Sequence, residues 1–296
     1  RQPLVVGIGA SAGGLEALQD FLINLPKDHD YAVVIIQHLD PDHDSLLQEL
    51  LAKTTTTPVH TATDGQLVQS GNIYLIAPGE ALTIADGHLI TEDFEKPRGR
   101  RRPIDQFFES LALNSGSNAV AIVLSGTGSD GAVGVRSVKE HGGLVFVQDP
   151  EQSKYDGMPR SAIDTGAHDL VLPVGEMVDV LQDYFRHMDG LTPTVLTDAE
   201  FIKRAMKHVR YRTGHDFQNY KPGTLLRRIA VRMSVLGITK PNTYLKELIE
   251  SPTEASRLFR DMLINVTSFF RNPAFWRCTS AALPTKSPLS ILTNRS

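Results

Sequence analysis

Two kinds of segment alternate along the first 190 residues. Short runs that are almost continuously apolar lie at residues 3–9, 31–37, 72–77, 119–124, 143–148 and 169–173. Such runs are typical of parallel strands whose two faces are both covered by helices. Segments with helical periodicity lie between them, at residues 14–25, 44–53, 104–114, 132–142 and 175–188. The alternation predicts an α/β fold with a doubly wound, mostly parallel, Rossmann-like sheet, to which residues 82–91 add a hairpin around Asp86 and Gly87.

The pattern changes after residue 189. Residues 190–199 show no periodicity and are expected to link two domains. Four amphipathic segments follow, punctuated by Gly or Pro, at residues 198–214, 223–237, 241–251 and 252–265. We therefore predict an α/β domain over residues 1–189 and a small all-α domain over residues 200–276. Residues 277–296 have no helical periodicity and are expected to be an irregular tail that belongs to neither domain.

The charge changes sign at the same place. Residues 1–196 carry 13 Lys and Arg against 27 Asp and Glu, a balance of −14. Residues 197–276 carry 14 against 7, a balance of +7, and the last 20 residues add +3, which together give the net charge of −4. This reversal supports the domain boundary and suggests that the second domain meets an acidic partner.

Cysteine content and hydropathy exclude several classes of protein. Cys278 is the single cysteine of the sequence, which excludes internal disulfides and cysteine-rich metal sites and fits a reducing cytoplasm. No apolar run reaches 18 residues, so we expect no insertion into a membrane. We also expect no metal site.

The turn after the first predicted strand, in the sequence VVGIGASAGGLEAL, has two interpretations. The spacing of Gly7, Gly9 and Ala12 fits a dinucleotide fingerprint, in which glycines let the backbone approach a pyrophosphate. The spacing of Gly9, Ser11 and Gly13 fits a nucleophile elbow, in which a serine lies on a tight turn between strand and helix. The first interpretation predicts a nucleotide-binding domain without catalysis, and the second predicts a hydrolase.

Two later turns favour the hydrolase. A dinucleotide site has an acidic residue at the end of its second strand, but His38 lies there and Asp40 comes two residues later. The glycine-rich turn after the strand at 119–124 carries Asp130. The carboxyl ends of parallel strands meet at one edge of a sheet, so Ser11, His38 and Asp130 are expected to lie together there. They would act as nucleophile, general base and orienting carboxylate. Asp130 could instead only cap the helix that follows it.

These motifs resemble the catalytic domain of the chemotaxis receptor methylesterases of CheB type. The resemblance rests on Gly-Ala-Ser-x-Gly-Gly near the start, Gln-His after the second strand and Gly-x-Gly-x-Asp-Gly after a later strand. It extends over residues 72–79, 101–108 and 156–163, and covers about residues 3–188. It implies a cofactor-independent serine esterase that hydrolyses glutamyl methyl esters on cytoplasmic receptor helices and deamidates certain receptor glutamines. It also implies that Ser11, His38 and Asp130 are the triad.

An ester hydrolase needs backbone N–H donors for the oxyanion. Candidates are the N–H groups of Ala12 and Gly13, at the start of a helix, and the turn at Thr127 and Gly128. Thr127 occupies a position where the family often has Met. Residues 95–103 form a basic loop, in which Arg102 is expected either to be solvated or to steer an acidic receptor helix.

The second domain has its own resemblance. Residues 261–276, DMLINVTSFFRNPAFW, resemble the end of the N-terminal helical domain of the chemotaxis receptor methyltransferases of CheR type. The resemblance implies that Asn265, Thr267 and Arg271 contact S-adenosylmethionine. It also implies that a basic helix docks on the acidic methylation helix of the receptor, through Arg227, Arg228 and Arg232. The alternatives are a solvated basic face and a nucleic-acid surface, and the lack of interleaved aromatic residues disfavours nucleic acid.

The sequence thus predicts a methylesterase joined to a truncated methyltransferase. No glycine-rich cofactor motif follows Trp276, so we expect no methyl transfer, and S-adenosylmethionine only in a longer parent protein. That parent is expected to be a fusion with further kinase or sensory modules. The receiver domain that usually precedes these methylesterases is absent from the sequence, so activity is expected to be constitutive or controlled elsewhere. The remaining alternative is a signalling scaffold that binds receptors without turnover.

Overall fold

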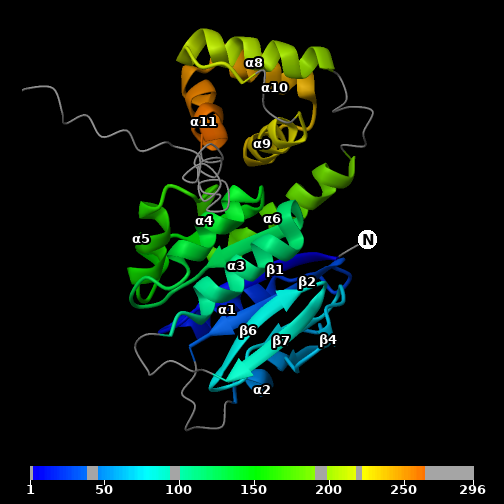
Figure 1. Cartoon of the computed structure of the whole chain (residues 1–296), viewed down its shortest axis with the longest axis vertical. Coiled ribbons are helices and arrows are strands. Elements are labelled where there is room, and N and C mark those ends of the chain that lie inside the picture. The colour runs from blue at the N-terminus through cyan, green and yellow to red at the C-terminus, as the bar shows by residue number, and fades with distance from the viewer. Residues whose placement is uncertain (1–2, 39–45, 94–100, 191–198, 218–221, 264–296) are drawn as a thin grey trace, which may run out of the picture.

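The computed structural model describes residues 3–38, 46–93, 101–190, 199–217 and 222–263. Its larger part is an α/β layer structure built on a seven-stranded sheet, and four further helices lie at one end of it (Figure 1). The predicted fold class, a doubly wound parallel sheet followed by a small all-α domain, is confirmed.

The large sheet is parallel throughout its described strand pairs, in the order β10-β9-β8-β1-β2-β5-β3. Its strands are β1 (Leu4–Ala10), β2 (Tyr31–Gln37), β3 (Val59–Thr61), β5 (Ile73–Leu75), β8 (Ala119–Val123), β9 (Leu144–Gln148) and β10 (Leu170–Leu172). Nearly every position of β1, β2, β8 and β9 is buried, as continuous apolar strands between two helical layers must be. The six predicted strands are confirmed. The sequence did not reveal β3, which is three residues long at the sheet edge and half exposed.

Helices cover both faces of this sheet. They are α1 (Gly14–Ile23), α2 (Leu47–Ala52), α3 (Pro103–Ser115), α4 (Ala132–Glu140), α5 (Gly157–Asp164) and α6 (Val174–Gly190), with 3₁₀ turns at Gly116–Asn118 and Pro150–Gln152. The apolar faces of α1, α2 and α6 form one core, which includes Phe21 and Leu181. Those of α3, α4 and α5 form the core on the other face, which includes Phe107 and Val135. All of these α-helices except α5 were predicted.

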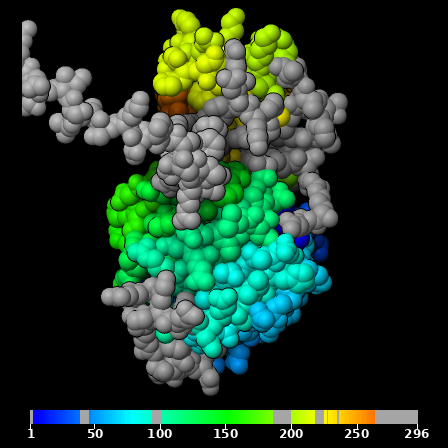
Figure 2. Space-filling view, viewed as in Figure 1, coloured from blue at the N-terminus to red at the C-terminus, as the bar shows by residue number. Residues whose placement is uncertain are grey.

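A small antiparallel sheet lies against α3. It contains β4 (Gln66–Leu67), β6 (Glu80–Ala85) and β7 (His88–Asp93), and Figure 2 shows its hairpin and α3 forming one continuous surface. The hairpin predicted at Asp86 and Gly87 is confirmed, and both residues have positive φ, 49° and 78°. The Ser110 hydroxyl accepts a hydrogen bond from the Ile84 N–H at 3.1 Å, which fixes the hairpin on the helix.

The four predicted helices of the second domain are confirmed. They are α8 (Ala199–Thr213), α9 (Pro222–Val235), α10 (Pro241–Glu250) and α11 (Pro252–Leu263). Their apolar faces enclose a separate core, to which Val209, Ile229, Leu248 and Leu258 each contribute a side chain that is fully buried. Amphipathic helices of this length gain most of their stability from such packing.

The two cores meet along α9 and α6. Val231 on α9 packs into the core of the α/β part, and the Arg228 guanidinium donates to the Lys139 carbonyl at 2.7 Å. Lys139 also forms a fully buried ion pair with Asp169. The Arg228 guanidinium also donates to the Gly143 carbonyl, and Gly143 lies just before β9. Asp169 lies just before β10. The helical part therefore packs at the amino-terminal edge of the sheet, opposite the edge at which the strands end.

Candidate active site

Strand register brings Ser11 and His38 side by side. β1 and β2 are parallel neighbours in which Ala10 pairs with Gln37, and Ser11 and His38 are the next residue of each strand's chain. The His38 N–H donates to the Ala10 carbonyl at 3.3 Å, which continues the ladder past the strand ends. Both side chains thus start from the carboxyl edge of the sheet, where ligands bind in folds of this kind.

Asp130 reaches the same edge from the turn between β8 and α4. Its Oδ2 accepts a hydrogen bond from His38 Nε2 at 2.7 Å. The Asp130 side chain is 6% exposed, whereas that of His38 is 37% exposed. The histidine therefore faces solvent on one side and a buried carboxylate on the other.

The hydrogen bond to Asp130 decides which nitrogen of His38 is free. A carboxylate only accepts, so Nε2 carries the proton and Nδ1 presents its lone pair. Between the described side chains of Ser11 and His38 there is no hydrogen bond, and catalytic groups commonly close such a gap when substrate binds. The arrangement can supply a base that takes the serine proton and a carboxylate that stabilises the imidazolium.

Four hydrogen bonds hold the Asp130 carboxylate. Besides His38, the backbone N–H of Ile104 donates to Oδ2 at 3.1 Å. The N–H groups of Asp105 and Gly131 each donate to Oδ1 at 2.9 Å. Ile104 and Asp105 belong to the first turn of α3, and a helix N-terminus favours a negative charge. The alternative prediction, that Asp130 caps the helix after it, is wrong: no described N–H group within α4 donates to Asp130, which caps the first turn of α3 instead.

The turn that carries Ser11 has the strand–turn–helix geometry of a nucleophile elbow. The Gly14 N–H donates to the Ser11 carbonyl at 2.8 Å, and Gly13, at φ 68°, precedes α1. A Cβ on Gly13 would lie 2.8 Å from Lys154 Cβ and 2.9 Å from Ser125 Oγ. Only glycine fits this position, both for its backbone conformation and for the space around it.

Free backbone donors flank the serine. The N–H groups of Ala12 and Gly13 have no hydrogen-bond partner among the described residues, and they lie at the N-terminus of α1. The N–H groups of Thr127 and Gly128 likewise have none in the described part of the chain, and both residues are exposed. Gly126 connects this second turn to the serine, because a Cβ on Gly126 would lie 2.9 Å from Ser11 Cβ. Both turns chosen from the sequence as oxyanion sites therefore border Ser11.

Arg102 lies at the edge of the site. Its side chain is 54% exposed, and Nη1 forms an ion pair with Asp105 Oδ2 at 3.0 Å. Nη2 donates to the Ser129 hydroxyl at 3.4 Å, in the turn that leads to Asp130. The guanidinium is accessible to an acidic ligand, while it also braces the turn of the candidate triad.

The arginines of α9 differ from the expectation that they dock on a receptor helix. Arg228 is 1% exposed and is engaged by the α/β part, as described above. Arg232 forms a buried bidentate ion pair with Glu254, at 2.9 Å and 2.6 Å. Both follow the buried face of α9, beside Ile229 and Met233, so neither side chain is available to a partner in this arrangement. The Arg227 side chain and residues Asn265, Thr267 and Arg271 lie outside the described residues.

Two contributors to the site were missed in the sequence. Asp105 joins Arg102 to the first turn of α4, through the N–H groups of Val133 and Gly134. Ser125 Oγ donates to the Ala12 carbonyl at 2.9 Å and accepts from the Tyr155 N–H at 3.0 Å, which ties the serine turn to the loop before α5. The only signal for Asp105 in the sequence was an acidic residue in the first turn of a predicted helix. That signal did not indicate that Asp105 also binds the first turn of another helix, α4.

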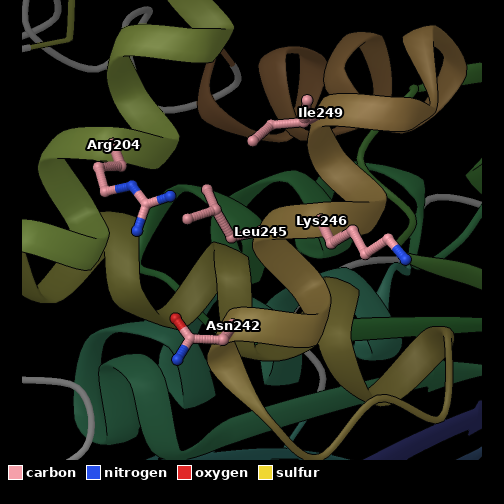
Figure 3. Close-up of a pocket in the computed structure, with 5 residues that line it drawn as sticks. All are labelled: Arg204, Asn242, Leu245, Lys246 and Ile249. Carbon is pink, nitrogen blue, oxygen red and sulfur yellow. The ribbon is translucent and has the colours of Figure 1, made fainter.

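A cavity among the described residues lies away from this site, between α8 and α10. It has a volume of about 400 Å³, and Figure 3 shows Arg204 extending from α8 towards Leu245 on α10. Its remaining lining residues are Asn242, Lys246 and Ile249. The described residues contain no cluster of His, Cys, Asp and Glu that could hold a metal ion, and no helix among them could span a membrane.

Comparison with known families assigns both parts of the chain. The CheB methylesterase family model matches residues 6–181, and the model of the CheR methyltransferase all-alpha domain matches residues 200–263. The first match covers more than half of the sequence, so this chain belongs to the CheB methylesterase family, with a CheR-type helical domain following in the same chain. Both resemblances inferred from the sequence are confirmed.

Individual relatives agree with this assignment. The chain is 38% identical over 195 residues to a protein-glutamate methylesterase/protein-glutamine glutaminase of Thiobacillus denitrificans, covering 62% of this chain and 54% of the relative. It is 38% identical over 255 residues to an uncharacterized 104.1 kDa protein of Rhodobacter capsulatus, covering 77% of this chain and 26% of that protein. The crystal structure of the Thermotoga maritima CheB methylesterase catalytic domain matches with a TM-score of 0.56 and 33% identity, over 60% of this chain and 97% of that domain.

The chain matches only part of the Thiobacillus and Rhodobacter proteins. It spans about half the length of the methylesterases that it matches and about a quarter of the Rhodobacter protein.

Proposed function

We propose that this chain is a protein-glutamate methylesterase and protein-glutamine deamidase that acts on chemotaxis receptors through Ser11, His38 and Asp130. The observation that carries the proposal is the 2.7 Å hydrogen bond between His38 and the buried Asp130, at the edge where β1 delivers Ser11. The names of the relatives support the substrate class.

The reaction follows from the groups at this edge. Ser11 Oγ attacks the γ-ester carbonyl of a receptor glutamate while His38 Nδ1 removes its proton. The tetrahedral oxyanion is stabilised by N–H groups of the two turns, from the set Ala12, Gly13, Thr127 and Gly128. Collapse of the intermediate expels methanol, which takes the proton back from His38. Water, activated by the same histidine, then releases glutamate from the acyl-enzyme. With a glutamine substrate, ammonia leaves in place of methanol.

The same groups argue against the nucleotide-binding alternative. His38 stands at the end of β2, where a dinucleotide site has its acidic ribose ligand, and the His38 ring is committed to Asp130. The esterase chemistry needs no cofactor. A cytoplasmic location, association with kinase or sensory modules, and S-adenosylmethionine binding by any protein that also carries a methyltransferase catalytic domain are further proposals.

The position of the helical domain bears on whether it can block the candidate active site. The domain packs at the amino-terminal edge of the sheet, whereas the candidate triad lies at the carboxyl edge. The described helices α8 to α11 therefore leave the serine accessible. We infer that the helical domain is not a lid on the esterase.

Methanol release from a methylated receptor cytoplasmic fragment tests the proposed function. The wild-type chain is expected to release methanol, and Ser11→Ala to lower the rate at least about 10⁴-fold, because the nucleophile is lost. Ser256→Ala is the matched control, since Ser256 is an exposed serine on α11. Methanol release that survives in Ser11→Ala would refute the nucleophile, and release by neither protein would favour a binding scaffold.

A further inference from the structure

Two buried aspartates of the candidate site, Asp105 and Asp130, each accept hydrogen bonds from the N-terminus of a helix next to the other. Asp130, which comes just before α4, accepts hydrogen bonds from the first turn of α3 at Ile104 and Asp105. Asp105, which lies in the first turn of α3, accepts hydrogen bonds from the first turn of α4, at Val133 and Gly134, both at 2.9 Å. Each carboxylate therefore caps the helix that carries or follows the other.

This reciprocal arrangement fixes the two helix ends against each other. A Cβ on Gly134 would lie 3.0 Å from the Asp105 carbonyl oxygen, so the helices are in close contact at this point. Asp105 is 5% exposed and Asp130 is 6% exposed, so water cannot readily replace these hydrogen bonds. A shift of α3 relative to α4 would break caps on both helices at once.

Asp105 has one further partner, at the surface. Its Oδ1 serves both N–H groups of α4, and its Oδ2 accepts from Arg102 Nη1 at 3.0 Å. Arg102 thereby neutralises the second carboxylate of the pair. Two buried carboxylates joined through one helix turn would otherwise repel each other.

We propose that Asp105 is a positioning residue of the active site, which holds the Asp130 carboxylate against His38 by clasping α3 to α4. Asp105 forms no described contact with Ser11 or His38, so it acts only through Asp130. The hydrogen bond that it protects is the 2.7 Å contact between Asp130 Oδ2 and His38 Nε2. The expected effect on kcat rests on the proposed esterase function, whereas the expected effect on the hydrogen bond between His38 and Asp130 does not.

The spectroscopic test uses the full chain labelled with ¹⁵N at histidine. The His38 ring proton bonded to Asp130 is expected as a downfield resonance, assigned by its loss in His38→Gln. Asp105→Ala is expected to abolish this resonance. Asp105→Asn keeps an oxygen for the α4 N–H groups but puts an amide donor against Arg102, and it is expected to weaken the resonance while the chain stays folded.

The kinetic test compares the same variants. A displacement of about 1 Å at a catalytic group lowers rates about 100-fold, so kcat is expected to fall about 10-fold to 100-fold in Asp105→Ala, with KM changed less than about twofold. Glu109→Gln is the matched control: it lies one turn along α3, and no described hydrogen bond links Glu109 to Asp130. It is expected to keep both the resonance and kcat.

The outcomes separate the two proposals. A folded Asp105→Asn with an unchanged resonance and unchanged kcat overturns the positioning role, as does a loss of kcat with the resonance intact. If Asp105→Ala does not fold, Asp105→Asn decides alone. If the wild-type chain shows the resonance, and Asp105→Ala loses it, but no methanol is released, the esterase proposal fails and the clasp stands.

Discussion

Gly126 lies between the candidate nucleophile and the wall of its site. A Cβ at this position would overlap the sulfur of Met158, which is fully buried, and would lie 2.9 Å from Ser11 Cβ. The backbone of Gly126 is itself held, since its N–H donates to the Tyr155 carbonyl at 3.0 Å and its carbonyl accepts from the Met158 N–H at 2.8 Å. The position cannot relax away from both neighbours.

Gly126→Ala is therefore expected to damage the site and not only the core. Overpacking costs about 1–3 kcal/mol of unfolding free energy, and displacement of Ser11 lowers kcat. Thermal unfolding and ester hydrolysis measure the two effects. The double variant Gly126→Ala with Met158→Ala removes the overlap with sulfur, so it is expected to lose less stability than the sum of the two single variants. A single variant with wild-type stability and kcat would show that the space around Ser11 is looser than described.

At the scale of elements, periodicity predicted most of what positions the site. The main strands were predicted correctly because short, continuously apolar runs are typical of buried parallel strands. The prediction that Ser11, His38 and Asp130 lie together followed from the parallel arrangement of the strands alone. The short elements β3, β4 and α5 were missed, because two or three residues, or a helix with an internal proline, carry no periodic signal. Asp105 was missed because its hydrogen bonds reach residues 28 and 29 positions away.

At the arginines of α9, the sequence analysis predicted an exposed surface that the structure does not have. The resemblance to the CheR-type domain implied a docking face, and both that face and the alternative of a solvated face put these cations at the surface. The structure buries Arg228 and Arg232 because Asp169 and Glu254, from distant elements, neutralise them. Partners brought by tertiary packing leave no mark in local sequence.

His29 gives a prediction about the connections between elements. It is 7% exposed, between α1 and β2, and its ring contacts the Tyr31 carbonyl at 2.8 Å and the Thr57 hydroxyl at 3.3 Å. Burial lowers the pKa of His29 below its ordinary value of 6.5. The unfolded chain therefore binds a proton that the folded chain does not, and the free energy of unfolding falls as the pH drops below about 6.5.

Denaturant unfolding between pH 8 and pH 5 measures this dependence. His29→Gln is expected to lower stability at pH 8, through lost hydrogen bonds, and to reduce the loss below pH 6.5 by at most about 1.4 kcal/mol per pH unit for one proton. His141→Gln, at an exposed histidine, serves as the control. An unchanged pH slope in His29→Gln would mean that other groups, such as the half-buried His168, account for the dependence.

At the scale of the whole molecule, a buried charge cluster joins the two family domains. Lys139 and Asp169 come from the α/β part, and Arg228 and Asp261 come from the helical part, with Lys139 to Asp261 and Arg228 to Asp169 both at 3.9 Å. Burial raises the pKa of Asp261 above its ordinary value. Charges of both signs from both sides make the interface specific, because undocking would separate Lys139 from Asp261 and Arg228 from Asp169.

Arg228→Ala is expected to weaken this interface by about 1–3 kcal/mol, since it removes the hydrogen bonds to the Lys139 and Gly143 carbonyls and the 3.9 Å contact with Asp169. Calorimetry of the wild type is expected to show one cooperative transition, and the variant two, with the helical part unfolding first. Arg257→Ala, on the exposed face of α11, is the control. Ester hydrolysis is expected to be unchanged in Arg228→Ala, because the triad lies at the other edge. Unchanged cooperativity would contradict a joint mediated by Arg228.

The most direct test of the central claim is covalent labelling with a fluorophosphonate, followed by peptide mapping by mass spectrometry. We expect a single phosphonyl group on Ser11, with labelling at least about 10³-fold slower in His38→Ala, because the base is lost. Labelling of a different serine, or labelling of Ser11 at the same rate without His38, would contradict the account of this edge as a serine hydrolase site.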